Sequence, residues 1–161
     1  MQTFLPEADF AAVARVLDTR RLGKQRVEAL QILRALTRPV YGWKHHPAVR
    51  MWAGYEEALT AYALAMCAEW TARGHADTVA TTVVDDLRIG TGCHAVRTQA
   101  ELAAAGLLPP WLGDEEFHRS HRSALRRKEP ELYRPAFPDV DDDLPYVWPA
   151  PVPSAHSGES R

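Results

Sequence analysis

Apolar side chains recur every three or four residues from Val49 to Trp70, and this stripe constrains the fold more than any other feature. Its members are Val49, Trp52, Tyr55, Leu59, Tyr62, Met66 and Trp70. Such a period places one face of a helix against a core over about seven turns. The pattern predicts one long helix from Pro47 to Arg73, ended by Gly74 as a C-terminal cap.

The rest of the chain predicts further helices and no repeat. Helical spacing and capping residues indicate segments from Pro6 to Leu17, from Asp18 or Thr19 to Leu36 with Val27 on the buried face, Asp77 to Arg88, Thr98 to Ala105, and Asp114 to Lys128. The segment Thr81–Val84 would also suit a strand. Beyond Pro130 we expect an extended chain. The fold class is all-α: a single compact domain of about five helices over residues 1–148, with an extended aromatic and proline-rich C-terminal segment and a disordered tail at 149–161.

Composition supports one domain with a real core, because 46% of the 161 residues are hydrophobic. Cys67 and Cys93 belong to no metal-binding or disulfide pattern, and Cys67 is expected in the core. No apolar run is long enough to cross a membrane, and no signal peptide is evident. We expect a cytoplasmic, nucleoid-associated monomer that needs no cofactor and no metal, and that does not bind membranes.

The densest positive charge surrounds Gly23, where Arg20, Arg21, Lys24 and Arg26 fall within seven residues at the start of a helix. Residues 15–50 hold nine lysines and arginines against two acids, whereas the whole chain carries a net charge of −2. A stripe of this kind suits phosphates or an acidic protein partner. The alternative is the ordinary charged outer face of a helix.

A second basic segment lies on the helix expected after Asp114. Arg119, Arg122 and Arg126 share one face, and His118 and His121 are three residues apart. The two imidazoles lack a third protein ligand, so we predict no metal site. We expect one histidine to be hydrogen-bonded in the core and the other to face a phosphate.

The loop before Pro47 combines a stacking ring, a cation and two imidazoles in Trp43, Lys44, His45 and His46. Aromatic rings interleaved with cations suit bases and backbone phosphates together. In the alternative interpretation, Trp43 packs on the core and His46 only starts a helix. The aromatic segment 143–149 is expected to pack back on the body. The chain has no nucleophile elbow, phosphate-binding glycine loop or dinucleotide fingerprint, which disfavours the corresponding enzyme classes.

Four segments together resemble the pyrimidine-dimer DNA glycosylases of the phage endonuclease V type, and more closely their uncharacterised bacterial relatives. They are residues 1–6, 18–26, 66–75 and 117–133. The resemblance implies a compact helical fold and a glycosylase/AP lyase acting on damaged or modified double-stranded DNA. In that family the N-terminal amine attacks C1′ of the damaged nucleotide, an imine forms, and β-elimination cuts the strand.

Carried over to this chain, the resemblance implies that Met1 supplies the amine, because methionine is usually retained before a residue as large as Gln2. Glu28 is the expected acid/base or imine stabiliser, although it is separated from Arg26 by Val27, whereas the family's glutamate follows its arginine directly. The residues expected to bind the nucleic acid are Arg20, Arg21, Lys24, Arg26, Trp43, Lys44, His46, His118, Arg119, His121 and Arg122.

Two other functions remain open: a DNA-binding module of the same fold without the chemistry, and a protein-interaction domain. They can be distinguished by geometry. The enzyme interpretation gains if residues 20–28, 43–46 and 118–126 converge on one groove beside residue 1, and it loses if they point apart.

Overall fold

The structure is a computed structural model that describes residues 1–150, and within them every regular element is a helix. This confirms the all-α class, with eight helices instead of about five. They are α1 (Phe10–Val16), α2 (Thr19–Thr37), α3 (Pro47–Arg50), α4 (Glu56–Ala72), α5 (Val79–Thr91), α6 (Gln99–Ala104), α7 (Glu115–Lys128) and α8 (Pro130–Ala136).

The long helix predicted from Pro47 to Arg73 is wrong in its continuity. A turn between α3 and α4 interrupts it, and Gly54 has the left-handed conformation there with φ 85°. Val49 before the turn, Trp52 within it and Leu59 after it are nevertheless all buried, so the stripe marks a core and not a single helix. The predicted end is confirmed, since the Gly74 N–H donates to the Thr71 carbonyl at 2.9 Å.

Helix starts follow the capping side chains. Asp18 caps α2 and Asp114 caps α7, as predicted, and the capping box of Thr98 and Glu101 is present at α6. The first helix begins at Phe10 and not at Pro6, because Asp9 caps it by accepting the Ala12 N–H at 2.9 Å.

The helix predicted from Asp77 to Arg88 is confirmed, and two other expectations are wrong. Residues 79–91, where a strand was the alternative, form a helix. Val27 is 41% exposed, not buried. The part of this segment from Pro130 to Ala136 forms α8, because proline suits the first turn of a helix, where its missing N–H needs no partner, and residues 137–150 form no helix or strand.

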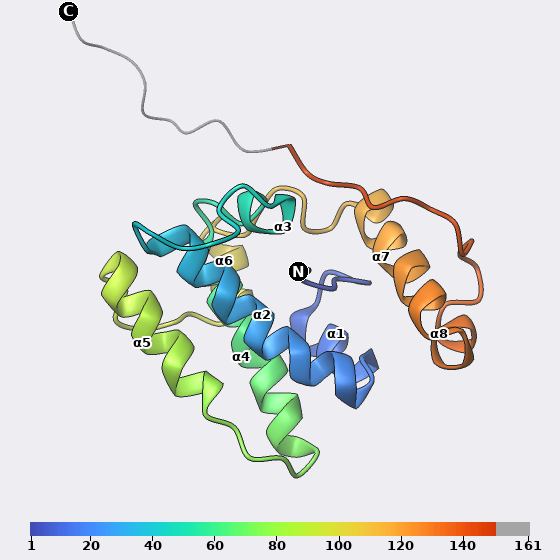
Figure 1. Ribbon diagram of the computed structural model, residues 1–161, viewed down its shortest axis with the longest axis horizontal. Helices are drawn as coiled ribbons and strands as arrows, with labels where there is room; N and C mark the ends of the chain where they lie inside the picture. Colours follow the sequence, from blue (N-terminus) through green and yellow to red (C-terminus); the bar gives the residue numbers. More distant parts are fainter. Residues whose placement is uncertain (151–161) are drawn as a thin grey trace, which may run out of the picture.

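The helices form a layered body around α4. Helix α2 packs on α4 and α5, α4 also contacts α1 and α6, and α7 pairs with α8. Figure 1 shows α7 and α8 at one end, with the start of the chain between them and α2. An aromatic cluster joins α7 to the helices around α4. The ring centroids of Trp52 and Trp111 lie 4.9 Å apart, and so do those of Trp111 and Phe117.

The segment after α8 runs back over α7, as expected for the aromatic residues 143–149. The N–H groups of Leu144 and Val147 donate to the hydroxyls of Ser123 and Ser120 at 3.0 and 3.1 Å. We call residues 142–148 the strap.

The predicted disordered tail falls, from residue 151 onward, outside the described residues. Among the described helices, none is long and apolar enough to cross a membrane.

Candidate active site

The N-terminal segment, residues 1–6, is extended and enclosed between helices. Gln2, Thr3, Phe4 and Leu5 are all buried, and Met1 is half-buried. Because the segment forms no helix or strand, its backbone polar groups require side-chain partners. These partners come from α2, α4 and α7, so three helices fix the position of the chain's first residues.

Helix α2 supplies two of the partners. The Gln2 N–H donates to Glu28 Oε2 at 3.0 Å, and the Phe4 N–H donates to Gln25 Oε1 at 2.8 Å. The Gln25 amide returns a hydrogen bond to the Gln2 carbonyl at 3.0 Å and lies 3.3 Å from the same Glu28 oxygen. Gln25 therefore couples the start of the chain to the carboxylate that the resemblance nominated.

Helix α7 supplies two imidazoles that hold a single residue. The Leu5 N–H donates to His121 Nδ1 at 3.0 Å, and His118 Nδ1 lies 2.8 Å from the Leu5 carbonyl. His118 Nε2 also accepts the Gly113 N–H at 2.9 Å, so His118 Nδ1 carries the proton of the neutral ring. Burial lowers the pKa of His118, and it lowers the pKa of His121 to about 3.

This arrangement confirms the core position predicted for one histidine and contradicts the phosphate-facing position predicted for the other. They are 3% and 0% exposed, so neither can face a phosphate, and both position the N-terminal segment. Within residues 1–150, no group of three His, Cys, Asp or Glu side chains is placed to hold a metal ion.

A pocket of about 520 Å³ opens beside this segment. Its walls come from the N-terminal segment, α2, His46, the end of α7 and the strap. The lining residues are Met1, Gln2, Phe4, Arg20, Arg21, Lys24, Gln25, Glu28, His46, Lys128, Tyr146 and Trp148.

Three of the lining cations, Arg20, Lys24 and Lys128, are exposed at the pocket. No ion pair among residues 1–150 involves any of them. Their positive charge is therefore not neutralised by neighbouring carboxylates. A pocket with such a rim attracts a polyanion.

Arg21 also lines the pocket, but its guanidinium lies 2.9 Å from Asp18. Asp18 also accepts a hydrogen bond from the Tyr133 hydroxyl at 2.6 Å. Burial alone would raise the pKa of Asp18, but the hydrogen bonds from Tyr133 and Arg21 outweigh it and the pKa is lowered. Arg21 thus links α2 to α8 and has less charge to offer a ligand than Arg20 or Lys24.

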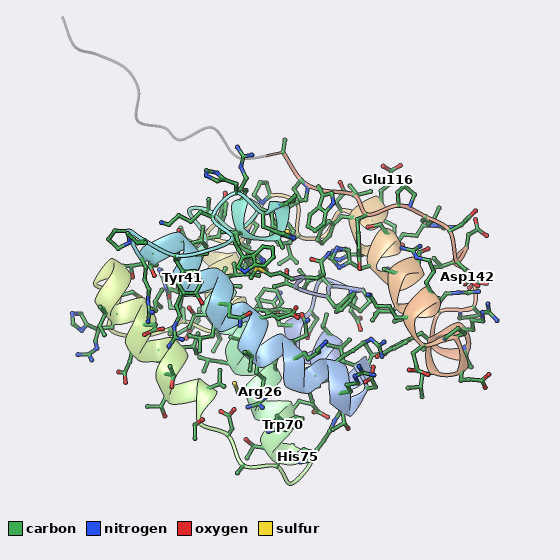
Figure 2. The ribbon with its side chains drawn as sticks, viewed as in Figure 1. Arg26, Tyr41, Trp70, His75, Glu116 and Asp142 are labelled. Atoms are coloured by element: carbon green, nitrogen blue, oxygen red, sulfur yellow. The ribbon has the colours of Figure 1, made fainter. Side chains whose placement is uncertain are left out.

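Arg26 turns away from the pocket. It pairs with Asp77, and its guanidinium lies 4.2 Å from the ring centroid of Trp70, which stacks on His75 at 4.1 Å. Figure 2 shows Arg26, Trp70 and His75 together near the end of α4, away from the start of the chain. The phosphate-binding role predicted for Arg26 is therefore at odds with its position.

Cys67 is buried in the same region, as expected for a core residue. Burial, with the nearby Asp77 carboxylate, raises the pKa of Cys67 to about 12. The thiol is therefore protonated at neutral pH and is a poor nucleophile.

His46 caps α3 and faces the pocket. Its Nδ1 accepts the Ala48 N–H at 3.1 Å, which places the proton of the neutral ring on Nε2. Burial lowers the pKa of His46, and the positive charge of the N-terminus lowers it further. The His46 ring also lies edge-on to Trp148 at 6.1 Å, so loop and strap close one side of the pocket together.

The remaining predicted residues lie outside the pocket. Trp43 is exposed near His46, and Lys44 is held by the Arg38 carbonyl. Arg122 pairs with Glu115 at 2.7 Å and donates to the Pro6 carbonyl at 2.7 Å. Arg119 is exposed on another part of α7, beside the strap.

The expected convergence is therefore partial. Residues of the segment 20–28, together with His46, meet beside Met1, whereas residues 118–126 contribute only supports. The sequence interpretation missed Gln25, Lys128, Tyr146 and Trp148 as lining residues. Gln25 did carry a signal, since it is a polar side chain on the buried face of α2, and the strap's aromatic content was a second signal.

Comparison with known families agrees with this geometry. A family model described as pyrimidine dimer DNA glycosylase matches residues 1–82, just over half of the chain's 161 residues. The matched part holds the N-terminal segment, α2 and His46, and it leaves out α7, α8 and the strap. No curated protein and no solved structure matched the chain. On the strength of the family match, the chain belongs to the pyrimidine dimer DNA glycosylase family.

Proposed function

We propose that this protein is a DNA glycosylase and AP lyase that acts on pyrimidine-dimer-like lesions in duplex DNA through the α-amine of Met1. One observation carries the proposal: the first residue and Glu28 share a pocket with Arg20, Lys24 and Lys128, three cations that form no ion pair within residues 1–150. The pocket thus combines a nucleophile, a proton carrier and a phosphate-binding rim.

The first step is substitution at C1′ of the damaged nucleotide. The uncharged amine forms a bond to C1′, and the glycosidic C1′–N bond breaks, its electron pair leaving with the base, which takes a proton from water. An uncharged amine is a competent nucleophile for forming an imine. The proton released from the attacking nitrogen passes to the Glu28 carboxylate, which lies 3.0 Å from the next backbone nitrogen, that of Gln2.

The second step opens the sugar and cuts the strand. The C1′–O4′ bond breaks, O4′ takes the proton from Glu28, and the nitrogen lone pair completes a protonated imine. The Glu28 carboxylate then removes a proton from C2′, a C2′=C3′ double bond forms, and the 3′ phosphate leaves with the electron pair of the C3′–O bond. Water hydrolyses the imine and frees the amine.

Binding is assigned to the rest of the pocket. Arg20, Lys24 and Lys128 hold the phosphates that flank the lesion, and His46 with Trp148 forms the wall against the extrahelical nucleotide. Because Tyr146 and Trp148 line the pocket, we propose residues 1–148 as the functional unit. We further propose that this unit works as a monomer and without a cofactor.

Removal of Met1 would leave the chemistry in place. The α-amine would then belong to Gln2, whose nitrogen already lies 3.0 Å from Glu28. The intact mass of the protein isolated from cells decides between the two amines. A blocked N-terminus would overturn the proposal.

Reductive trapping provides the direct test. The protein is incubated with a duplex containing an abasic site or a thymine dimer, and borohydride then reduces any imine to a stable amine. We expect a covalent adduct on the N-terminal peptide, located by mass spectrometry. DNA binding without an adduct would indicate a non-catalytic binding module. No affinity for duplex DNA at moderate salt would indicate a protein-interaction domain.

A further inference from the structure

Trp43 combines two unfavourable features that the pocket does not explain. It is the one non-glycine residue among residues 1–150 with a positive φ, at 67°. Its indole is also 66% exposed. A bulky side chain rarely adopts the left-handed region, and a large aromatic ring gains stability from burial. Neither feature helps this loop to fold.

The core-packing interpretation of Trp43 is thus wrong, and its position suggests another role. The His46 N–H donates to the Trp43 carbonyl at 2.9 Å, and the two rings lie edge-on with centroids 6.0 Å apart. His46 lines the pocket, whereas Trp43 does not. The turn therefore presents the indole from the pocket's rim.

The surroundings specify what the ring meets. Arg20, Lys24 and Lys128 line the same pocket and favour a polyanion. A partner with a charged backbone and flat apolar faces is a stack of nucleobases, which accepts an indole regardless of sequence. An acidic protein would match the cations but would offer no flat faces to this ring.

We propose that Trp43 inserts into the base stack at the place that a nucleotide vacates when it enters the pocket. The ring replaces the stacking that the displaced nucleotide gives up, so the open state of the duplex persists long enough for reaction. Apolar wedges that separate base steps are a general way to distort a duplex. This role deepens the proposed function and rests on it, because it takes duplex DNA as the substrate.

A fluorescent base tests the insertion independently of the chemistry. A duplex with a thymine dimer carries 2-aminopurine opposite the lesion, where its fluorescence rises on unstacking. We expect a large rise with the wild-type protein and little with Trp43→Ala, whose dissociation constant increases by about 5- to 150-fold, the range for loss of one stacked ring. Trp43→Phe keeps most of both signals, and Trp43→Leu, which lacks a flat ring, loses them.

Val40→Ala is the matched control, because Val40 is 91% exposed in the same loop. An equal fluorescence rise and affinity in Trp43→Ala and wild type would overturn the insertion. So would an equal loss in Val40→Ala, because the loop as a whole would then be responsible.

Failure of the proposed chemistry gives a different result. On a duplex with a preformed abasic site, where no base must leave the stack, borohydride trapping by the wild-type protein reports on the chemistry alone. If the wild-type protein forms no adduct, the lyase assignment falls, while the 2-aminopurine signal still reports on Trp43.

Discussion

Glu28 and Arg26 are close in sequence on α2, but their side chains have different partners. They are two residues apart, so their side chains leave α2 about 200° from each other. Arg26 consequently faces Asp77 and Trp70, and Glu28 faces the N-terminal segment. The carboxylate of Glu28 therefore lies beside Gln2, on the side of α2 opposite to Arg26.

Replacing Glu28 by glutamine keeps the shape of the side chain and removes its ability to carry a proton. We expect the single-turnover rate of strand cleavage to fall by about 10²- to 10⁴-fold, the usual contribution of a general acid–base. DNA affinity should stay equal or increase, since one negative charge leaves a cationic pocket. Glu116→Gln, an exposed acid on α7 that does not line the pocket, is the control. Equal rates for Glu28→Gln and wild type would remove Glu28 from the mechanism.

Lys24 should act through charge alone. The plot of log affinity against log salt concentration for Lys24→Ala should lose about 0.9 of its slope, the contribution of one phosphate contact. Arg88→Ala serves as the control, because Arg88 on α5 pairs with Asp85 and does not line the pocket. If both variants change the slope equally, the pocket does not track the DNA backbone.

At the scale of elements, α7 acts as a clamp. His118 and His121 lie three residues apart on one face and bond both backbone groups of Leu5. Backbone groups that a sheet would satisfy with a neighbouring strand are here satisfied by a helix. The clamp requires neutral imidazoles, because His121 Nδ1 must accept a hydrogen bond.

This requirement predicts how stability depends on pH. Burial lowers the pKa of His121 to about 3 in the folded state, against about 6.5 in the unfolded chain. Between these values the unfolded state binds more protons, so the free energy of unfolding falls as the pH falls below about 6.5. The expected slope is about 1.4 kcal/mol per pH unit for this histidine, measured by urea unfolding between pH 7.5 and 4.5.

A variant separates His121 from other groups. His121→Gln should flatten the pH dependence of stability, whereas His94→Gln, at an exposed position, should leave it unchanged. Lowered carboxylate pKa values, such as that of Asp18, affect stability only at lower pH. The lowered pKa values of His118 and His46 leave a smaller slope in His121→Gln, so a slope as steep as that of the wild type would contradict the assignment.

At the scale of the whole molecule, the pocket is made by parts distant in sequence. Its floor belongs to the family-matched residues 1–82, and one wall belongs to the strap. Arg127 fixes the strap through the carbonyls of Asp142 and Leu144 at 2.9 and 2.7 Å. The strap thus adds a surface that the matched segment lacks.

Truncation after Asp143 should leave the helices intact and open the pocket. We expect an unchanged far-UV circular dichroism spectrum, a lower melting temperature because Tyr146 no longer packs on the core, and weaker binding to a dimer-containing duplex. The double variant Tyr146→Ala/Trp148→Ala should reproduce the loss of binding in the full chain. Full affinity in both proteins would show that the strap is not part of the site.

Short-range sequence patterns predicted most helix starts. Contacts between residues distant in sequence could not be predicted from such patterns. Caps such as Asp18 and Asp114 act within one turn, so they fixed the starts of α2 and α7. The turn at Gly54 was not predicted, because the apolar residues keep their helical spacing across it. The histidines were misassigned because their partner, Leu5, lies 113 and 116 residues away, and no local pattern marks such a contact.

The long reach from Leu5 to α7 also bears on biosynthesis. On the ribosome, Leu5 is made before its partner His121, which lies 116 residues later. At about 5–20 residues per second, translation takes about 6–23 s to reach it. Partly translated chains therefore have the contacts of Gln25, Glu28 and Tyr62 to this segment but lack the hydrogen bond from Leu5 to His121 until α7 has been made.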